Sequence, residues 1–164
     1  MEIVDNYLDE TSFKLLNETM SSDMFPWFFN DYKLHPKPNI GDDSLFDYQF
    51  THVFYKDFKI NSNYFDTLYP LILKMNIKAL VRIKANLNPV SDKLIEYEKH
   101  KDQENFNCRG AIYYVNSNNG YTMFDNEKVE AKENRIVFFN TNMIHSGTNS
   151  TDCKNRMVIN FNYF

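Results

Sequence analysis

Apolar residues recur at two different periods along the chain, and the period changes near residue 76. Before that point the pattern predicts two helices and two short strands. The first helix begins behind Asp9, a residue type that caps helix N-termini, and its apolar residues follow at helical spacing. The second is expected over 62–75, where Pro70 predicts a kink or a late start. The strands are expected at 3–4 and 50–55.

From residue 77 onward, apolar and polar residues alternate in short runs separated by polar turns, which is typical of β-strands. Asn119-Gly120 has the sequence of a hairpin turn between two of these runs. Helices followed by many short strands predict a mostly β protein with flanking α-helices, built as a sandwich or barrel such as a jelly roll. The expected strands are 77–87, 110–115, 121–124, 128–131, 135–139, 143–146 and 156–164.

Two stretches ahead of the strand-rich part have a composition of their own. Residues 24–32 contain one Trp, one Tyr and three Phe, and are expected to lie over the core as an irregular aromatic segment. A wall that faces a substrate is the alternative. Residues 34–44 are rich in Pro, Gly, Asn and Asp, which is typical of a loop. A plain surface loop is expected there, with a lid as the alternative, and His35 is expected to be a solvent-exposed residue of it.

Length and charge narrow the class of protein. A chain of 164 residues is expected to form one domain, and an aromatic content of 16% favours a sheet-rich fold. The net charge is −4 and no basic patch stands out, so no nucleic-acid partner is expected. No apolar run reaches about 18 residues, so no membrane span is expected. The N-terminal sequence is acidic and lacks the features of a signal peptide, so we expect a cytoplasmic protein.

Several chemically reactive residues are expected to have structural roles. Cys108 and Cys153 form no CxxC pair and are expected to be free thiols. His52 shares one strand face with apolar residues, which is typical of a hydrogen-bonded core histidine. Residues 93–101 mix Lys with Glu, which indicates a solvated segment.

His100 and Asp102 form a candidate metal site. Two residues apart on an extended backbone, their side chains lie on one face and can share an ion. Imidazole and carboxylate ligands suit Fe(II), and two His with one carboxylate form the non-haem iron arrangement. The second His must come from elsewhere, and His145 is the only other histidine after Asp102. An HxD motif alone is weakly specific, since two solvated polar residues give the same sequence.

Arg156 begins the last expected strand. By the two-residue period of a strand it shares a face with Val158 and Asn160. An arginine on the inner face of a sheet needs an anion, because burying an unpaired charge is costly. A ligand carboxylate held by two parallel hydrogen bonds meets this need. An ion pair with Asp152 is the alternative.

In this order the motifs resemble the catalytic core of the Fe(II)/2-oxoglutarate dioxygenases, in particular the prolyl-4-hydroxylase-like branch with its small single-domain bacterial and phage members. That family shows HxD, a YYLN-like strand, a GGxTxF-like strand, a V-x-P-like strand, an apolar strand that ends in His, and then an Arg or Lys. The present sequence reads HKD, AIYYVN, NGYTMF, KVEAKENRIVFFN, MIHSG and NRMVINFNYF. The match covers roughly residues 83–164, half of the chain.

The resemblance implies a double-stranded β-helix, a cupin-like jelly roll, in a single domain over 1–164. Residues 1–76 would support a catalytic core at 77–164. It also implies Fe(II), O2 and the cosubstrate 2-oxoglutarate, which is converted to succinate and CO2 while a substrate C–H bond is hydroxylated. A prolyl residue in a peptide or protein is the family's analogy for the substrate, and a free amino acid or another small molecule is the rival.

The resemblance also assigns roles to single residues. His100, Asp102 and His145 would be the catalytic iron ligands. Arg156 would bind the distal carboxylate of 2-oxoglutarate. Tyr114 matches a tyrosine whose hydroxyl supports the same carboxylate, with a core tyrosine as the alternative.

The sequence departs from the family pattern at positions outside the iron ligands. Asn86 stands where many relatives carry a tyrosine that reaches the cosubstrate, and Ala131 replaces a Pro. Asn86 and Arg109 are candidate substrate-contacting residues, with a solvated arginine as the alternative for Arg109.

Two other classes of protein remain as alternatives to the enzyme. One is a non-catalytic double-stranded β-helix that binds a metal or a small acid. The other is a structural β-sandwich with an accidental HxD. The complete set of iron ligands together with Arg156 favours the enzyme. The sequence leaves the oligomeric state open.

Overall fold

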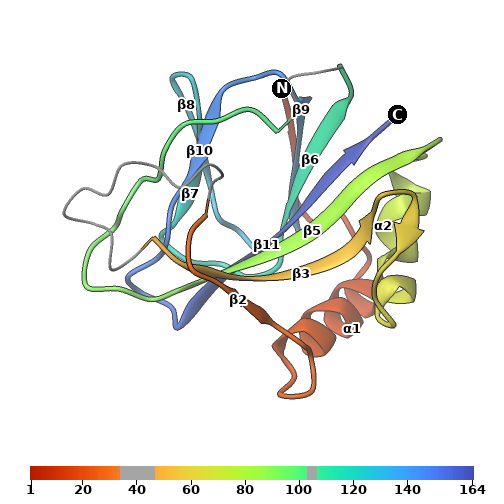
Figure 1. The fold of residues 1–164 in the computed structure, drawn as a ribbon, viewed down its shortest axis with the longest axis horizontal. Coiled ribbons are helices and arrows are strands. Elements are labelled where there is room, and N and C mark those ends of the chain that lie inside the picture. The colour runs from red at the N-terminus through yellow and green to blue at the C-terminus, as the bar shows by residue number, and fades with distance from the viewer. Residues whose placement is uncertain (34–46, 103–106) are drawn as a thin grey trace.

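The computed structural model drawn in Figure 1 describes residues 1–33, 47–102 and 107–164. Its elements in chain order are β1 (Glu2–Val4), α1 (Glu10–Ser21), β2 (Phe28–Asn30), β3 (Gln49–Lys56), β4 (Lys59–Ile60), the 3-10 helix η2 (Phe65–Leu68), α2 (Tyr69–Lys74), β5 (Leu80–Pro89), β6 (Arg109–Tyr114), β7 (Tyr121–Phe124), β8 (Glu127–Glu130), β9 (Arg135–Asn140), β10 (His145–Gly147) and β11 (Asn155–Tyr163). None of the described helices is long and apolar enough to cross a membrane.

Two antiparallel sheets pack against each other. Within the described ranges the large sheet has eight strands in the order β1-β9-β6-β11-β5-β3-β2, with β4 paired to β3. The small sheet has the order β10-β7-β8. The small sheet covers one face of the large sheet, and α1 and α2 cover the other (Figure 1). The expected mostly β fold with flanking helices and a jelly-roll core is confirmed.

The two helices begin where the sequence predicts. The Asp9 carboxylate accepts a hydrogen bond from the Ser12 backbone N–H at 3.0 Å and so caps α1, whose Leu16 and Met20 are buried. Pro70 lies in the first turn of α2, where a missing N–H is harmless, and a 3-10 turn precedes it. The second helix therefore starts late, as expected.

Strand alternation gives β5 and β11 of the large sheet one apolar face and one face that is richer in polar groups. On β11, alternate residues beginning at Met157 join the core beneath the helices, while Arg156 and the residues in phase with it face the small sheet. On β5 the residues in phase with Ile83 join that core, and those in phase with Arg82 face the other way. Each large apolar side chain buried under the helices contributes roughly 1.5–3 kcal/mol. The opposite face is rich in polar groups, and the candidate site lies there.

The hairpin expected at Asn119-Gly120 is wrong. The strand before it, β6, pairs with β9 and β11, whereas the strand after it, β7, pairs with β8 and β10. The segment therefore crosses from one sheet to the other. A glycine is needed because a Cβ at Gly120 would lie 2.5 Å from the Asn149 carbonyl oxygen and 2.6 Å from Arg156 Cδ.

The aromatic segment 24–32 is only partly irregular. Its middle forms the short edge strand β2, which exposes Phe28 and Phe29, while Phe25 is buried in the core. The expected loop or lid at 34–44, with His35, lies outside the described residues.

His52 is a core residue, as expected. Its ring nitrogens lie 2.7 Å from the Pro26 carbonyl oxygen and 2.6 Å from Ser62 Oγ, and it is 3% exposed. Cys108 and Cys153 are free thiols.

Candidate functional site

Backbone pairing brings the two halves of the candidate metal site together. His145 begins β10 and lies opposite Phe124 of β7. His100 forms an isolated antiparallel bridge with His145, with hydrogen bonds of 2.8 and 2.9 Å in the two directions. The Asp102 backbone N–H then donates to the Thr141 carbonyl oxygen at 3.2 Å. The HKD segment is thus held as an additional strand-like stretch beside β10.

His100, Asp102 and His145 converge as the sequence motifs predict. Asp102 Oδ1 lies 4.0 Å from His100 Nε2 and 3.9 Å from His145 Nε2, and the three candidate ligand atoms lie within 4.8 Å of one another. Ligand atoms this close can bind a single ion. Two imidazoles and one carboxylate fit Fe(II) and leave further coordination positions for other ligands.

Backbone carbonyls orient both imidazole rings. His145 Nδ1 lies 3.1 Å from the Met143 carbonyl oxygen, and His100 Nδ1 lies 3.3 Å from that of Glu98. A carbonyl oxygen only accepts, so each Nδ1 donates its proton there. In the neutral ring Nε2 then carries the free lone pair, and both Nε2 atoms point towards Asp102. Such contacts fix the tautomer that a metal requires.

Two side chains of the large sheet hold the Asp102 carboxylate. Asn162 Nδ2 donates to Asp102 Oδ2 at 3.2 Å, and Arg82 Nη2 lies 3.6 Å from Asp102 Oδ1. Asn162 comes from β11 and Arg82 from β5, which are adjacent strands in register. The carboxylate is therefore oriented from the polar face of the large sheet.

Burial and aromatic rings surround the two imidazoles. The His145 ring is 4% exposed and lies 5.3 Å from the Phe124 ring and 5.1 Å from the Phe139 ring, between centroids. Burial, together with the neighbouring His145, holds the pKa of His100 below its usual value. A metal binds the neutral ring, so a lowered pKa extends metal binding to lower pH.

Arg156 is a buried cation in the same cavity. It is 2% exposed, and its Nη2 donates to the Tyr121 carbonyl oxygen at 3.2 Å and to Thr122 Oγ1 at 3.1 Å. Its Nε has no hydrogen-bond partner, and no carboxylate of the described residues pairs with it. The alternative partner Asp152 instead accepts from the Asn119 backbone N–H at 2.9 Å. Burial lowers the pKa of Arg156, and an anionic ligand would restore the balance of charge.

The cavity has a volume of about 300 Å³, at the lower end of the range for small-molecule sites, roughly 300–1,000 Å³. The metal cluster and Arg156 both line it. Buried polar atoms without a partner are rare in folded proteins. Within the described residues they are all on β5 and β11: Arg82 Nε, Asn86 Oδ1, Asn88 Oδ1, Arg156 Nε and Asn162 Oδ1. Their concentration here marks the place of a polar ligand.

Comparison with known proteins identifies the fold. No protein-family model matches the sequence, and no curated protein matches it. Solved structures do match over nearly the whole chain. A 2OG-Fe(II) oxygenase family oxidoreductase from Burkholderia pseudomallei has a TM-score of 0.67 at 8% identity, covering 98% of this chain and 83% of that one.

Two prolyl hydroxylases are similarly close. The enzyme from Trichoplax adhaerens, solved with a hypoxia inducible factor oxygen degradation domain peptide fragment, has a TM-score of 0.66 at 14% identity, covering 99% of this chain and 82% of that one. The Pseudomonas putida prolyl-4-hydroxylase has a TM-score of 0.63 at 11% identity, covering 99% and 91%. This chain shares the fold of these three structures. At such identities the likeness concerns the fold, so function must be argued from the site.

Tyr114 reaches the cavity only indirectly, through Thr122. It is fully buried, and its hydroxyl donates to Thr122 Oγ1 at 2.8 Å, the same atom to which Arg156 donates. Its ring lies 5.7 Å from the Arg156 guanidinium carbon. Thr122 itself lines the cavity and was not among the predicted site residues, although it is the Thr of the NGYTMF motif.

Of the two candidate substrate residues, the structure places one in the cavity and the other outside it. Asn86 lines the cavity. Arg109 does not; it is exposed, and its guanidinium carbon lies 5.9 Å from the Tyr163 ring. The reason is the strand period, because Arg109 is out of phase with the cavity-lining Ile112 of the same strand. Arg109 is thus the solvated arginine of the alternative.

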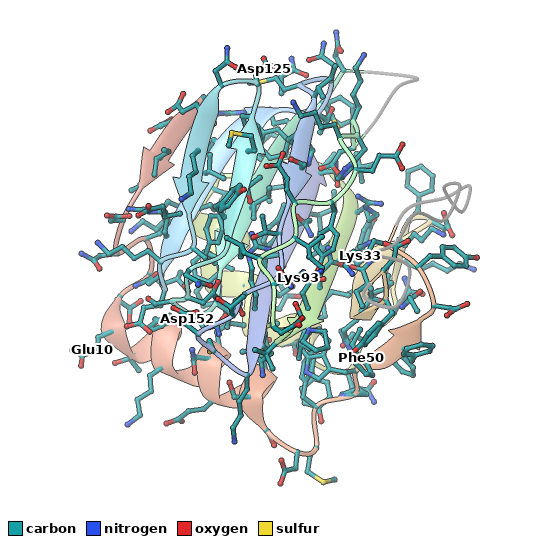
Figure 2. All side chains as sticks on the ribbon, turned by 90° about the vertical axis from the view of Figure 1, so that its left-hand side faces the viewer. Glu10, Lys33, Phe50, Lys93, Asp125 and Asp152 are labelled. Carbon is teal, nitrogen blue, oxygen red and sulfur yellow. The ribbon has the colours of Figure 1, made fainter. Side chains whose placement is uncertain are left out.

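Other cavity residues escaped prediction. Lys84 and Asn88 line it from β5, where their phase with Asn86 was visible in the sequence. Lys33 lies close to the β5 ribbon in Figure 2 and lines the same cavity. The expectation for 93–101 is only partly right, since Tyr97 also lines the cavity. Signals for Lys33 and Tyr97 were lacking, because both come from outside regular strands.

Proposed function

We propose that this chain is an Fe(II)- and 2-oxoglutarate-dependent dioxygenase that hydroxylates a substrate C–H bond. The observation that carries the proposal is the joint presence, in one cavity, of the cluster of His100, Asp102 and His145 and of the buried Arg156. A metal site alone fits many proteins, and a buried arginine alone fits any anion. Together they match a cosubstrate that chelates a metal at one end and presents a carboxylate at the other.

The residues present fit both groups. His100, Asp102 and His145 would hold Fe(II), because two neutral imidazoles and one carboxylate are the donor set that this ion takes in such enzymes. Arg156 would bind the distal carboxylate of 2-oxoglutarate, with Thr122 beside it. Bound together, iron and 2-oxoglutarate supply the oxidation, in which O2 and 2-oxoglutarate yield succinate, CO2 and a hydroxylated substrate.

The protein supplies orientation and a protected site. The carbonyl of Met143 holds the His145 ring, and Asn162 holds the Asp102 carboxylate. Phe124 and Phe139 flank the His145 ring and exclude water from that side. The Oδ1 atoms of Asn86 and Asn88 have no hydrogen-bond partner among the described residues and can accept hydrogen bonds from further polar groups of a ligand.

A prolyl residue in a peptide or protein is the proposed substrate. Two of the structures with this fold are prolyl hydroxylases, and one of them was solved with a peptide. A free amino acid is the rival substrate, and a non-catalytic module that binds a metal and a small acid is the rival function. The cavity accommodates small ligands, which keeps the free amino acid in contention.

Anaerobic absorption spectroscopy followed by admission of oxygen tests the proposal. Fe(II) and 2-oxoglutarate added without oxygen should give the visible charge-transfer band of the chelate, and oxygen should then yield succinate. His145→Ala should abolish the band. Arg156→Gln should weaken binding of 2-oxoglutarate, while the matched surface variant Arg109→Gln should leave it unchanged.

Each outcome has a definite meaning. No band, or a band unaffected by His145→Ala, would refute the site assignment. A band without succinate, in the presence of prolyl peptides and of free amino acids, would favour the binding module. Mass spectrometry for the gain of one oxygen atom would identify the class of substrate.

A further inference from the structure

Arg82 and Lys84 place two positive charges on the cavity wall far from Arg156. The antiparallel register sets Arg82 beside Asn162 and Lys84 beside Asn160, whereas Arg156 lies beside Asn88. A strand rises about 3.4 Å per residue, so Lys84 lies roughly 14 Å along β5 from Asn88, the neighbour of Arg156. A carboxylate bound at Arg156 therefore leaves Lys84 and Arg82 uncovered.

Nearby carboxylates balance the positive charges of Arg82 and Lys84 only in part. Among the described residues, Arg82 has one carboxylate contact, at 3.6 Å to Asp102, and its buried Nε has no partner. Asp102 is also the proposed metal ligand, so its charge is shared. The half-buried Lys84 makes no ion pair within residues 1–33, 47–102 and 107–164. Both side chains line the cavity, and Asp102 is the carboxylate whose charge acts on both of them.

The remaining lysines of the cavity are already solvated or engaged. Lys101 is exposed to solvent. Lys33 donates to the Tyr48 carbonyl oxygen at 2.6 Å, and its Nζ lies 3.9 Å from the centre of the Tyr97 ring. Arg82 and Lys84 are therefore the pair that an incoming anion would meet next to the metal cluster.

Among the described residues that line the cavity, positive charge stays in excess when the cavity is loaded. Five of these side chains are cationic and two are carboxylates: Lys33, Arg82, Lys84, Lys101 and Arg156 against Glu98 and Asp102. A divalent ion adds two positive charges, and the 2-oxoglutarate dianion removes two. The excess therefore remains for the second substrate, and a cavity of one sign concentrates ligands of the other.

We propose that Arg82 and Lys84 form a second anion-binding subsite, and that the substrate carries a carboxylate close to the C–H bond that is oxidised. The inference deepens the proposed function and rests on it for the reaction. The subsite concerns binding of the substrate, so it can be tested by measuring the Kd of substrate probes without any turnover. The carboxylate is either the α-carboxylate of a free amino acid derivative or the side chain of an acidic residue next to the target in a peptide.

Binding of matched probes tests this subsite. The protein is loaded with Zn(II) and 2-oxoglutarate, because zinc has no redox chemistry and prevents turnover. Ligand-observed NMR then gives the Kd of two probe pairs that differ in one negative charge. The first pair is N-acetylproline and N-acetylprolinamide. The second is the dipeptide amides acetyl-Pro-Asp and acetyl-Pro-Asn.

The expected result is that at least one acidic probe binds about tenfold or more tightly than its neutral partner, since charged hydrogen bonds are the strong ones. Lys84→Gln should remove most of that preference and Lys84→Arg should keep it. The surface variant Lys56→Gln removes a lysine charge elsewhere and should change nothing. The pair that shows the preference tells which source of carboxylate the site takes.

Three results would overturn the subsite: equal binding within both pairs, no detectable binding of either acidic probe, or an unchanged preference in Lys84→Gln. A failure of the proposed function is recorded separately. It appears in the loading step, as an absence of 2-oxoglutarate binding or as 2-oxoglutarate binding that Arg156→Gln leaves unchanged.

Discussion

Asn162 donates a hydrogen bond from Nδ2 to Asp102 Oδ2 at 3.2 Å, and so links the last strand to the carboxylate of the candidate metal cluster. Partners of this kind orient the ligand, and their loss lowers metal affinity by about 10- to 100-fold in other metal sites. We expect Asn162→Ala to weaken binding of Fe(II) or Mn(II) by a factor in that range. Metal titration checks this, with the surface variant Asn63→Ala as control. An affinity equal to that of the control would show that Asn162 does not position Asp102.

Arg156→Gln should weaken binding of 2-oxoglutarate more than binding of the metal. Hydrogen bonds to charged groups contribute about 1.5–3 kcal/mol, which corresponds to roughly 10- to 150-fold in Kd. Arg156→Lys retains the charge without the planar guanidinium, so its Kd for 2-oxoglutarate should lie between those of the wild type and Arg156→Gln. Titration of the anaerobic chelate band gives the Kd of all three proteins. Equal Kd values in the wild type and Arg156→Gln would show that Arg156 does not bind the cosubstrate.

Gly120→Ala should disturb the site without touching a ligand. A Cβ there would lie 2.6 Å from Arg156 Cδ and 2.5 Å from the Asn149 carbonyl oxygen, so the arginine or the backbone must move. Overpacking of this kind costs about 1–3 kcal/mol. We expect a lower free energy of unfolding in urea together with weaker 2-oxoglutarate binding. Unchanged values of both would mean that the crossing between the sheets is looser than its contacts indicate.

His52 should make the stability of the protein fall with acidity. Burial lowers the pKa of His52, so the folded state prefers the neutral ring. In the unfolded state the ring protonates as pH falls below its ordinary pKa of about 6.5. The stability that the neutral His52 contributes is therefore fully present above that pH. It is lost as pH falls from about 6.5 through the lower pKa of the folded state. Urea unfolding at pH 7.5 and 5.5 measures the loss, which should be smaller in His52→Gln. A loss of equal size in the variant would place its origin elsewhere.

The faces of the strands could be predicted because the strand period depends on the backbone alone. Arg156, Val158 and Asn160 share the cavity wall as the alternation requires. The same rule, applied to β6, separates Arg109 from Tyr114 and favours the solvated arginine that was the alternative for Arg109. Phase along a strand is local information, so a sequence contains it.

Pairing between distant strands could not be predicted in the same way. Asn119-Gly120 has hairpin chemistry, but its flanking strands belong to different sheets because their partners lie elsewhere in the chain. The phase of Lys84 with Asn86 was visible in the sequence, but the place of Arg82 and Lys84 opposite Asn162 and Asn160 became known only when β5 was found beside β11. Which strands become neighbours depends on long-range packing, so local residue preferences leave these positions open.

A crystal structure of the protein grown without oxygen in the presence of Mn(II) and 2-oxoglutarate tests the central claim most directly. We predict one anomalous metal peak in contact with His100, Asp102 and His145, with continuous density for 2-oxoglutarate from the metal to the guanidinium of Arg156. A metal bound elsewhere, or an Arg156 without a carboxylate partner at full occupancy of the metal, would contradict it.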